Sequence, residues 1–432
     1  MRILWLILAT LILGLLTWFT GQMVILILEL AVIDLFVTRR INWFFWLKKG
    51  YPRIPSWIQI IVWILLSAWV VRIFMIDNYT EMASSMKPVI LRGDNVLVSK
   101  ITFGPRMPVT PVNIPLAHHY FPFSRCRPSY LKSIELPYTR LRAARSVRRG
   151  DLLAYNFPEG DTALCGVETV SYYALKRTKL QQGDSIRMKN TQYRPVDRRE
   201  VEFSRCVALP GDTIQISMGK VTINNVSREP NEEISFDYLV EVENRQLPEV
   251  FLRKLGLEQS EIQIYPGLGY SMPLRSKQLP MIRQRPEVLA YHPNILPPDQ
   301  PDFNIFPHHP HYLWNRDNFG PLIVPRQGDS VRLTLVNLPV YKRIIRVYED
   351  NTLFIQDGNI YINNKPADYY HFKQNYFFVL GDNRHHSRDS RHWGFLPEDH
   401  IIGKPVCVWF SLQRFPDSRS RIRTKRFFTF LK

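Results

Sequence analysis

Residues Met82–Lys100 read MASSMKPVILRGDNVLVSK, and the rest of the chain is interpreted from them. This stretch begins a few residues after a long apolar segment, and it places Ser84 and Ser85 close to the rigid Pro88. The apolar and polar residues alternate at its end, as in a strand with one buried face. A serine at this place, just outside a membrane, could meet a membrane-bound chain as a nucleophile. The same residues also fit a polar turn between a membrane helix and a first strand.

Composition limits the classes of protein that fit. A chain of 432 residues is long enough for a membrane anchor and one large or two smaller globular units. The formal net charge of +18 suits a surface on anionic lipid, and no nucleic-acid motif accompanies it. We therefore expect a lipid bilayer as a partner and no nucleic acid. The four cysteines lack zinc spacing, so we expect no metal site, while disulfides and free thiols both stay open: Cys126, Cys165, Cys206 and Cys407.

The N-terminal part predicts a membrane anchor of two or three spans. Ile3–Phe19 is just long enough to cross a bilayer, whereas Met23–Val37 is short. Thr38–Arg53 is basic with interfacial aromatics, and the positive-inside rule places it in the cytoplasm. Trp57–Met75 then leads outward, so Ser85 is expected on the outer face, close to the lipid.

The rest of the chain is predicted to be mainly β, because short runs of Val, Ile, Tyr and Phe alternate with Gly, Pro, Asn and Asp. The strand candidates are Asp151–Tyr155, Cys206–Leu209, Thr213–Ser217, Val331–Val336, Tyr376–Leu380 and Val406–Ser411, and Glu249–Gln259 is a helix candidate. We expect an anchor over 1–76, a β-rich domain over 77–412 with insertions at about 102–149, 162–199 and 231–327, and a tail over 413–432. The basic and aromatic tail suits a membrane surface, and a disordered tail is the alternative.

An internal repeat joins two distant parts of the chain. From Arg205 the sequence reads RCVALPGDTIQISMGKVTINN, and it aligns with RIIRVYEDNTLFIQDGNIYINN from Arg343. Each copy predicts a strand, a turn and a hairpin with its tip at Met218-Gly219 or Asp357-Gly358. The shared Ile-Asn-Asn ending favours a duplication over two hairpins that merely look alike.

Four ordered stretches carry a resemblance to a known family. The Met82 stretch resembles the Ser-Met-x-Pro box of type I signal peptidases (leader peptidases), in which the serine before the methionine, here Ser85, is the nucleophile. Three further stretches resemble later boxes of the family: RRGDLLAYNFP from Arg148, SRCVALPGDTI from Ser204 and GDNRHHSRDSRHWGFLPEDHIIGKP from Gly381. The long insertions and the phrase GPRMPVTP from Gly104 look like those of the large Bacteroidetes members.

The resemblance implies a fold, an activity and a location. The expected architecture is a set of N-terminal transmembrane helices followed by a signal-peptidase-like β domain. The expected activity is that of a serine endopeptidase, a hydrolase that removes signal peptides from exported preproteins without a cofactor. The expected location is the bacterial inner (cytoplasmic) membrane, with the main domain facing the periplasm.

The sequence departs from the family at two positions. A serine nucleophile needs a base, and signal peptidases use a desolvated lysine before the Arg of the Lys-Arg-x-Val-x-Leu-Pro-Gly-Asp box. Here that position holds Ser204, whose hydroxyl is no base near pH 7. The second position is Ala83, where the family often has a Ser or Thr whose hydroxyl helps to hold the oxyanion.

Other groups are candidates for the base. Lys342 occupies the Ser204 position in the second repeat copy, and histidines suit the role by their ordinary pKa: His385, His386 and His392. Lys87 is too close to Ser85 in sequence for an easy in-line approach.

The resemblance also implies supporting residues in the last box. Ser387 maps to the serine that holds the lysine, and Asp389 and Arg391 map to a structural ion pair. Gly381 and Asp382 read as a tight turn.

Two hypotheses for function remain open from the sequence. One is an active membrane endopeptidase whose substrate lies as an extended strand beside the strand that follows Ser85. The other is a catalytically impaired paralogue that binds signal peptides or envelope partners without cleaving them. The residue that separates the two hypotheses is Ser204.

Overall fold

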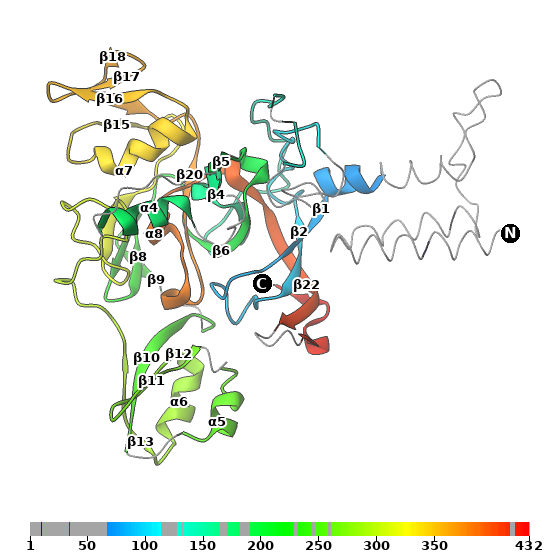
Figure 1. The fold of residues 1–432 in the computed structure, drawn as a ribbon, viewed down its shortest axis with the longest axis vertical. Helices are drawn as coiled ribbons and strands as arrows, with labels where there is room; N and C mark the ends of the chain where they lie inside the picture. Colours follow the sequence, from blue (N-terminus) through cyan, green and yellow to red (C-terminus); the bar gives the residue numbers. More distant parts are fainter. Residues whose placement is uncertain are drawn as a thin grey trace.

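The computed structural model describes residues 10, 34, 67–113, 128–131, 133–164, 171–181, 191–228, 232–243, 247–257, 261–414 and 420–431. Apart from residues 10 and 34, the first two expected membrane runs lie outside these residues, as do the basic loop, most of the third run and two of the cysteines. Within the described residues, no helix has both the length and the apolar character needed to cross a bilayer. The described domain begins with a helical segment, residues 67–74, that leads directly into the first strand (Figure 1).

The main sheet joins the two ends of the domain. Its strand order is β1-β2-β22-β3-β6-β20-β21, and neighbouring strands are antiparallel. The strands are β1 (Ile76–Thr80), β2 (Asp94–Ser99), β22 (Ile401–Arg414), β3 (Leu152–Asn156), β6 (Val201–Ala208), β20 (Tyr376–Leu380) and β21 (Leu396–Pro397). The long strand β22 therefore lies between β2 and β3, although it is formed near the end of the chain (Figure 1).

Alternation along the strands divides the apolar residues between the two faces of this sheet. In β3, Leu152 and Ala154 pack in one cluster with Met86, while Leu153 and Tyr155 pack in another. All five residues of β3 are buried, so both faces of the sheet are covered at its centre. The mainly β prediction is confirmed for the described domain.

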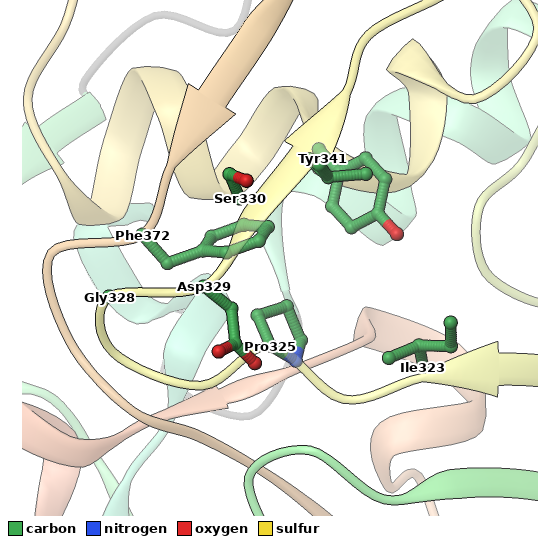
Figure 2. A pocket seen from close by; sticks show the side chains of 8 residues that line it. Ile323, Pro325, Gly328, Asp329, Ser330, Tyr341 and Phe372 are labelled. Carbon is green, nitrogen blue, oxygen red and sulfur yellow. The ribbon is translucent and has the colours of Figure 1, made fainter.

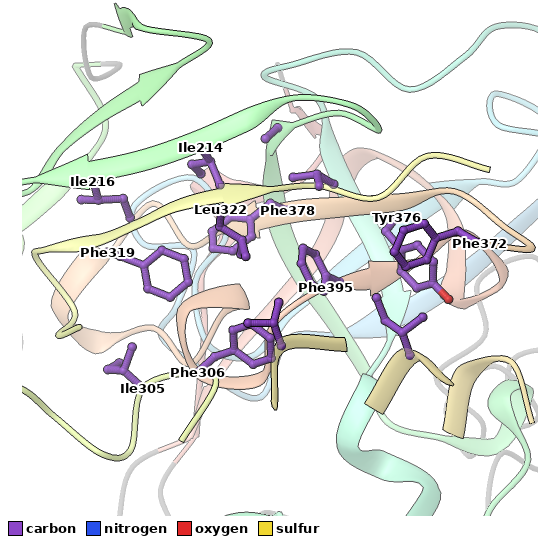
Figure 3. Close-up of a cluster of buried hydrophobic side chains, with 14 of the residues drawn as sticks. Ile214, Ile216, Ile305, Phe306, Phe319, Leu322, Phe372, Tyr376, Phe378 and Phe395 are labelled. Carbon is purple, nitrogen blue, oxygen red and sulfur yellow. The ribbon is translucent and has the colours of Figure 1, made fainter. Parts of the chain in front are cut away.

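A third and larger core lies between β20 and the strands beside it (Figure 3). It is rich in aromatic residues, among them Phe306, Phe319, Phe372, Tyr376, Phe378 and Phe395. Strand β14 (Phe319–Ile323) pairs with β7 (Thr213–Ser217) and brings its residues into this core. The remaining small elements are β4 (Thr162–Leu164), α4 (Tyr172–Gln181), β5 (Thr191–Tyr193), β15 (Ser330–Arg332), β19 (Tyr369–His371) and α8 (Ser390–Trp393).

The hairpins of the internal repeat have the same structure. The first copy forms β7, β8 (Lys220–Ile223) and β9 (Val226–Arg228), and the second forms β16 (Leu353–Gln356), β17 (Asn359–Ile362) and β18 (Lys365–Pro366). The two tips are tight turns with positive φ, which is 49° at Met218 and 50° at Asp357.

The turns that follow also match. The Asn224 carboxamide accepts the Thr213 N–H at 2.8 Å, and Asn363 accepts that of Thr352 at 3.0 Å. The hairpin part of the repeat prediction is therefore confirmed.

The preceding segments of the two copies differ. In the first copy the chain is a strand, β6, but in the second it is helical, as α7 (Leu338–Arg343) and η6 (Ile344–Tyr348). The strand prediction for the start of the second copy is wrong. Pro339 stands in the first turn of α7, and Ile344 and Ile345 are buried in the aromatic-rich core.

A separate small unit is built from the longest expected insertion. Its sheet has the order β11-β12-β10-β13, and it packs with α5 (Glu249–Lys254) and α6 (Leu279–Arg283) around its own core. The strands are β10 (Ser235–Val242), β11 (Gln263–Tyr265), β12 (Gly269–Arg275) and β13 (Val288–Pro293). This insertion unit lies apart from the main sheet (Figure 1), and the helix expected from Glu249 is confirmed, although α5 ends at Lys254.

The C-terminal residues fold back onto the domain. Strands β23 (Ser420–Ile422) and β24 (Thr429–Phe430) both pair with β22. Arg423 and Arg426 reach the buried carboxylate of Asp94 at the start of β2. Residues 420–431 are thus part of the folded domain, while the side chains of Phe428 and Phe430 remain exposed.

Candidate active site

Ser85 lies in the connection between β1 and β2 and is fixed through its backbone. The Asn383 N–H donates to the Ser85 carbonyl at 2.9 Å, and the Asn383 side-chain amide donates to the Ser84 carbonyl at 3.1 Å. Asn383 is buried, and it belongs to the box that begins at Gly381. Two boxes from opposite ends of the domain therefore meet at Ser85.

Gly381 allows this close approach. A Cβ atom on Gly381 would lie 2.2 Å from Ser387 Oγ and 2.7 Å from the Ser85 carbonyl oxygen, so only glycine fits here. Ser387 Oγ is therefore close to Ser85. It is buried, and it has no hydrogen-bond partner among the described residues.

A buried ion pair supports this turn. Asp389 accepts the Gly381 N–H at 3.0 Å, and it accepts two hydrogen bonds of 2.9 Å from the Arg391 guanidinium. Burial opposes ionisation, but the charge and hydrogen bonds of Arg391 hold the pKa of Asp389 below its ordinary value. The expected pairing of these residues is observed, and it orients the box that holds Ser85.

Ser204 lies at the same corner of the main sheet. Its neighbour Arg205 pairs with Leu380 across β6 and β20, and the Arg205 guanidinium binds Asp382 at 2.6 Å. Asp382 in turn directly precedes Asn383, the residue that holds Ser85. This connection places Ser204 within the same small region as the nucleophile candidate.

The Ser204 side chain has a partner of its own. Its Oγ lies 2.9 Å from the hydroxyl of Tyr155, which is buried in β3. The Tyr155 hydroxyl also donates to Glu202 Oε2 at 3.5 Å. Burial, followed by the charge of Glu202, raises the pKa of Tyr155 well above its ordinary value, so the phenol keeps its proton near neutral pH.

Two carboxyl groups flank the segment of Ser85, and neither belongs to a motif in the sequence. Glu81 Oε1 accepts the Ala83 N–H at 2.7 Å, while its buried Oε2 has no hydrogen-bond partner among the described residues. Burial raises the pKa of Glu81 to about 8, and the charge of Glu202 contributes to this rise. Burial also raises the pKa of Glu202 to about 7. Ala83 itself is exposed and brings no hydroxyl to the site.

The first alternative base is not brought to Ser85. Lys342 is exposed on α7, which lies on the opposite side of the domain from β1 and β2 (Figure 1). Lys87 is directed to the insertion unit, where its ammonium binds Glu261 at 2.9 Å.

Two histidines of the last box, His385 and His386, are engaged elsewhere. His385 Nδ1 accepts the Asp237 N–H at 3.2 Å, so its Nε2–H donates to Asp317 at 2.9 Å. His386 Nε2 lies 2.9 Å from Asp237 Oδ1, and this hydrogen bond raises the pKa of His386. Both histidines thus attach β10 to the main domain. Burial lowers the pKa of His392 to about 4.

The edges of the strands bear on the expected position of a substrate. Strand β2 pairs with β1 on one edge and with β22 on the other, so a substrate strand beside β2 has no edge to pair with and that expectation is wrong. In β6, residues Val201–Ser204 pair with β3 on one edge, whereas β20 pairs with the other edge only from Arg205 onward. No other strand among the described residues pairs with Val201–Ser204, so the edge that these strands leave open ends at Ser204.

Two further features lie away from this corner. A cavity of about 420 Å³ lies beside α7 and β15, with the carboxylate of Asp329 among mainly apolar lining residues (Figure 2). Cys206 and Cys407 are buried free thiols, which was one of the two possibilities that the sequence left open, the other being disulfides.

The comparisons with known proteins agree with these observations. The family model described as signal peptidase, peptidase S26, matches residues 54–267 and 369–410. The chain belongs to this family. All four boxes and Ser85 lie within the matched residues, whereas the second repeat copy with Lys342 lies in the break between them.

Individual signal peptidases match over shorter parts. Signal peptidase I of Haemophilus influenzae is 39% identical over 112 residues, which are 26% of this chain and 29% of that protein. Probable signal peptidase I-2 of Synechocystis is 29% identical over 113 residues, 22% of this chain and 49% of that protein. Signal peptidase I of Leptolyngbya laminosa is 30% identical over 118 residues, 24% of this chain and 58% of that protein. The chain thus spans less than two thirds of each of these relatives.

Proposed function

We propose that this chain is a membrane-bound serine endopeptidase that removes signal peptides from exported preproteins, with Ser85 as its nucleophile. The observation that carries the proposal is the convergence at Ser85, where Asn383 holds the backbone and Gly381 leaves room for it. Membership of the signal peptidase family supplies the class of reaction and of substrate. The natural setting is the bacterial inner membrane, with transmembrane helices in the N-terminal part and the β domain in the periplasm.

The open edge of β6 is the proposed place for the substrate. An extended peptide can pair with Val201–Ser204 and pass its scissile carbonyl to Ser85 at the end of this edge. The backbone N–H of Ser85 then remains to stabilise the oxyanion, because Ala83 has no hydroxyl. Asp389 and Arg391 act at a distance, because they support the turn that holds Ser85.

The test is cleavage of a precursor protein by the purified full-length chain in detergent, with the new N-terminus read by mass spectrometry. Wild type is expected to cleave at one position, and Ser85→Ala is expected to be inactive. Ser84→Ala is the matched control, because it removes the neighbouring hydroxyl and should keep most of the activity. Cleavage that persists in Ser85→Ala would refute the assignment of the nucleophile.

Ser204 favours the second candidate function, an impaired paralogue that binds signal peptides or envelope partners. The same preparations distinguish the two functions. A wild-type chain that crosslinks to the precursor without cleaving it, while Ser204→Lys cleaves, would establish a binding protein that has lost its base.

A further inference from the structure

Glu202 lies close to the segment that carries Ser85. Its charge acts on Glu81, whose carboxyl is hydrogen-bonded to the Ala83 N–H two residues before Ser85. Glu81 is only 4% exposed, and its Oε2 has no hydrogen-bond partner among the described residues. Ser387 Oγ, which lies near the Ser85 carbonyl beside Gly381, is likewise buried and unpartnered among these residues. Two buried oxygens near the Ser85 segment, Glu81 Oε2 and Ser387 Oγ, therefore have no hydrogen-bond partner among the described residues.

A line of hydroxyl groups connects Glu202 to the corner where Ser85 lies. The line runs from Ser204 Oγ to the Tyr155 hydroxyl over 2.9 Å and from there to Glu202 Oε2 over 3.5 Å. Ser204 stands at the position where this family has the lysine that takes the proton from the nucleophile. A hydroxyl cannot hold that proton, but it can pass it on to a neighbour that can.

We propose that Glu202 is the final acceptor of the Ser85 proton in this chain, and that Ser204 and Tyr155 pass the proton to it. This inference rests on the proposed peptidase function. In this inference, Ser204 belongs to a different proton path. The resemblance to the family alone would indicate only that the base has been lost.

The proton balance closes over one turnover. As Ser85 Oγ bonds to the scissile carbonyl carbon, its proton goes to Ser204, Ser204 passes one to Tyr155, and Tyr155 passes one to the Glu202 carboxylate. The proton returns along the same line to the leaving amine as the C–N bond breaks. In the second half, a water attacks the acyl ester and gives its proton to Glu202 by this route. Ser85 Oγ regains a proton as the ester bond breaks.

The electrostatics of the site suit this role. A general base works best when its pKa lies near the working pH, and burial raises the pKa of Glu202 to about 7. Activity should therefore rise with pH through about 7, because only the ionised carboxylate can accept a proton.

The experiment measures kcat/KM for precursor cleavage by the full-length chain in detergent between pH 5.5 and 9. Glu202→Gln and Tyr155→Phe are expected to lower it by a factor of about 10²–10⁴, the usual contribution of a general base. Asp368→Asn is the control, because Asp368 is exposed and is not among the main charges that act on Glu202, so it should leave the pH profile unchanged. Each of the two active-site variants is then combined with Ser204→Lys.

The combined variants separate a lost proton path from a damaged fold. A lysine at position 204 supplies its own base, so Glu202→Gln and Tyr155→Phe should have little further effect in the Ser204→Lys background. The inference is overturned if the wild type cleaves and Glu202→Gln keeps its rate and its pH profile, or if the loss in Glu202→Gln persists in the Ser204→Lys background. A wild-type chain with no cleavage at any pH would instead overturn the proposed function.

Discussion

Removal of the Asp389 carboxylate by Asp389→Ala is expected to lower the free energy of unfolding by about 3–5 kcal/mol. The Arg391 side chain is only 2% exposed, and Asp389 is fully buried. Without Asp389, the Arg391 guanidinium keeps its charge but loses its counter-ion. The hydrogen-bond acceptors that it retains are the backbone carbonyls of Arg316 and Arg384. A buried charge that loses its counter-ion costs this much because water cannot replace the lost partner.

A double-mutant cycle isolates the ion pair from other effects. Arg391→Ala should be similarly destabilising, since it leaves the Asp389 carboxylate buried with mainly backbone N–H donors. The double variant removes both charges, so its loss should be smaller than the sum of the two single losses by about 1.5–3 kcal/mol.

The cycle is measured by denaturant unfolding of the full-length chain in detergent, followed by tryptophan fluorescence. The exposed Asp368→Ala is the control, and it should change the free energy of unfolding by no more than about 0.5 kcal/mol. Additive losses in the double variant, or a loss below about 1 kcal/mol in Asp389→Ala, would contradict the assignment of a buried, coupled pair.

Three further predictions concern single positions. Under the alternative function, in which no group accepts the Ser85 proton, Ser204→Lys should raise the precursor-cleavage rate by about 10²–10⁴, with Ser204→Arg as an inactive control; equal rates in both variants would refute this prediction. Gly381→Ala should reduce cleavage more than tenfold, because its Cβ would lie 2.7 Å from the Ser85 carbonyl oxygen; an unchanged rate would show that the turn yields. Burial lowers the folded-state pKa of His400 to about 4, so the unfolded state binds its proton first and stability should fall as the pH drops from about 6.5 towards 4. Unfolding midpoints at pH 7.5 and 5.5 check this, and His400→Gln should show a smaller difference between them.

Much of the fold could be predicted because the sequence pattern and the local structure agree. Thr213–Ser217 and Tyr376–Leu380 are strands with the predicted bounds, and both hairpin tips are tight turns. The errors occur where a short apolar run has no clear period. The run that follows Arg343 packs into the core as a helix, and Val331–Val336 contains a strand only as far as Arg332.

The site was predictable in part. The boxes indicated that Ser85, Ser387 and Asp389 belong together, and in the structure all three lie near Gly381. Glu81 and Glu202 could not be found from the sequence, because no motif marks them and their proximity depends on the pairing of distant strands. The roles of His385 and His386 were equally hidden, since their partners lie in the insertion unit and in the segment before β14.

The place of β22 between β2 and β3 has a consequence for the time at which activity can appear. A chain made and exported from its N-terminus delivers Ser85 early, but the strand that closes the main sheet is among the last to arrive. Asn383, which holds Ser85, also comes late. Until translation has nearly ended, the newly made protein therefore has a serine without an organised site. On the proposed function, this order of arrival keeps the peptidase inactive during its own synthesis.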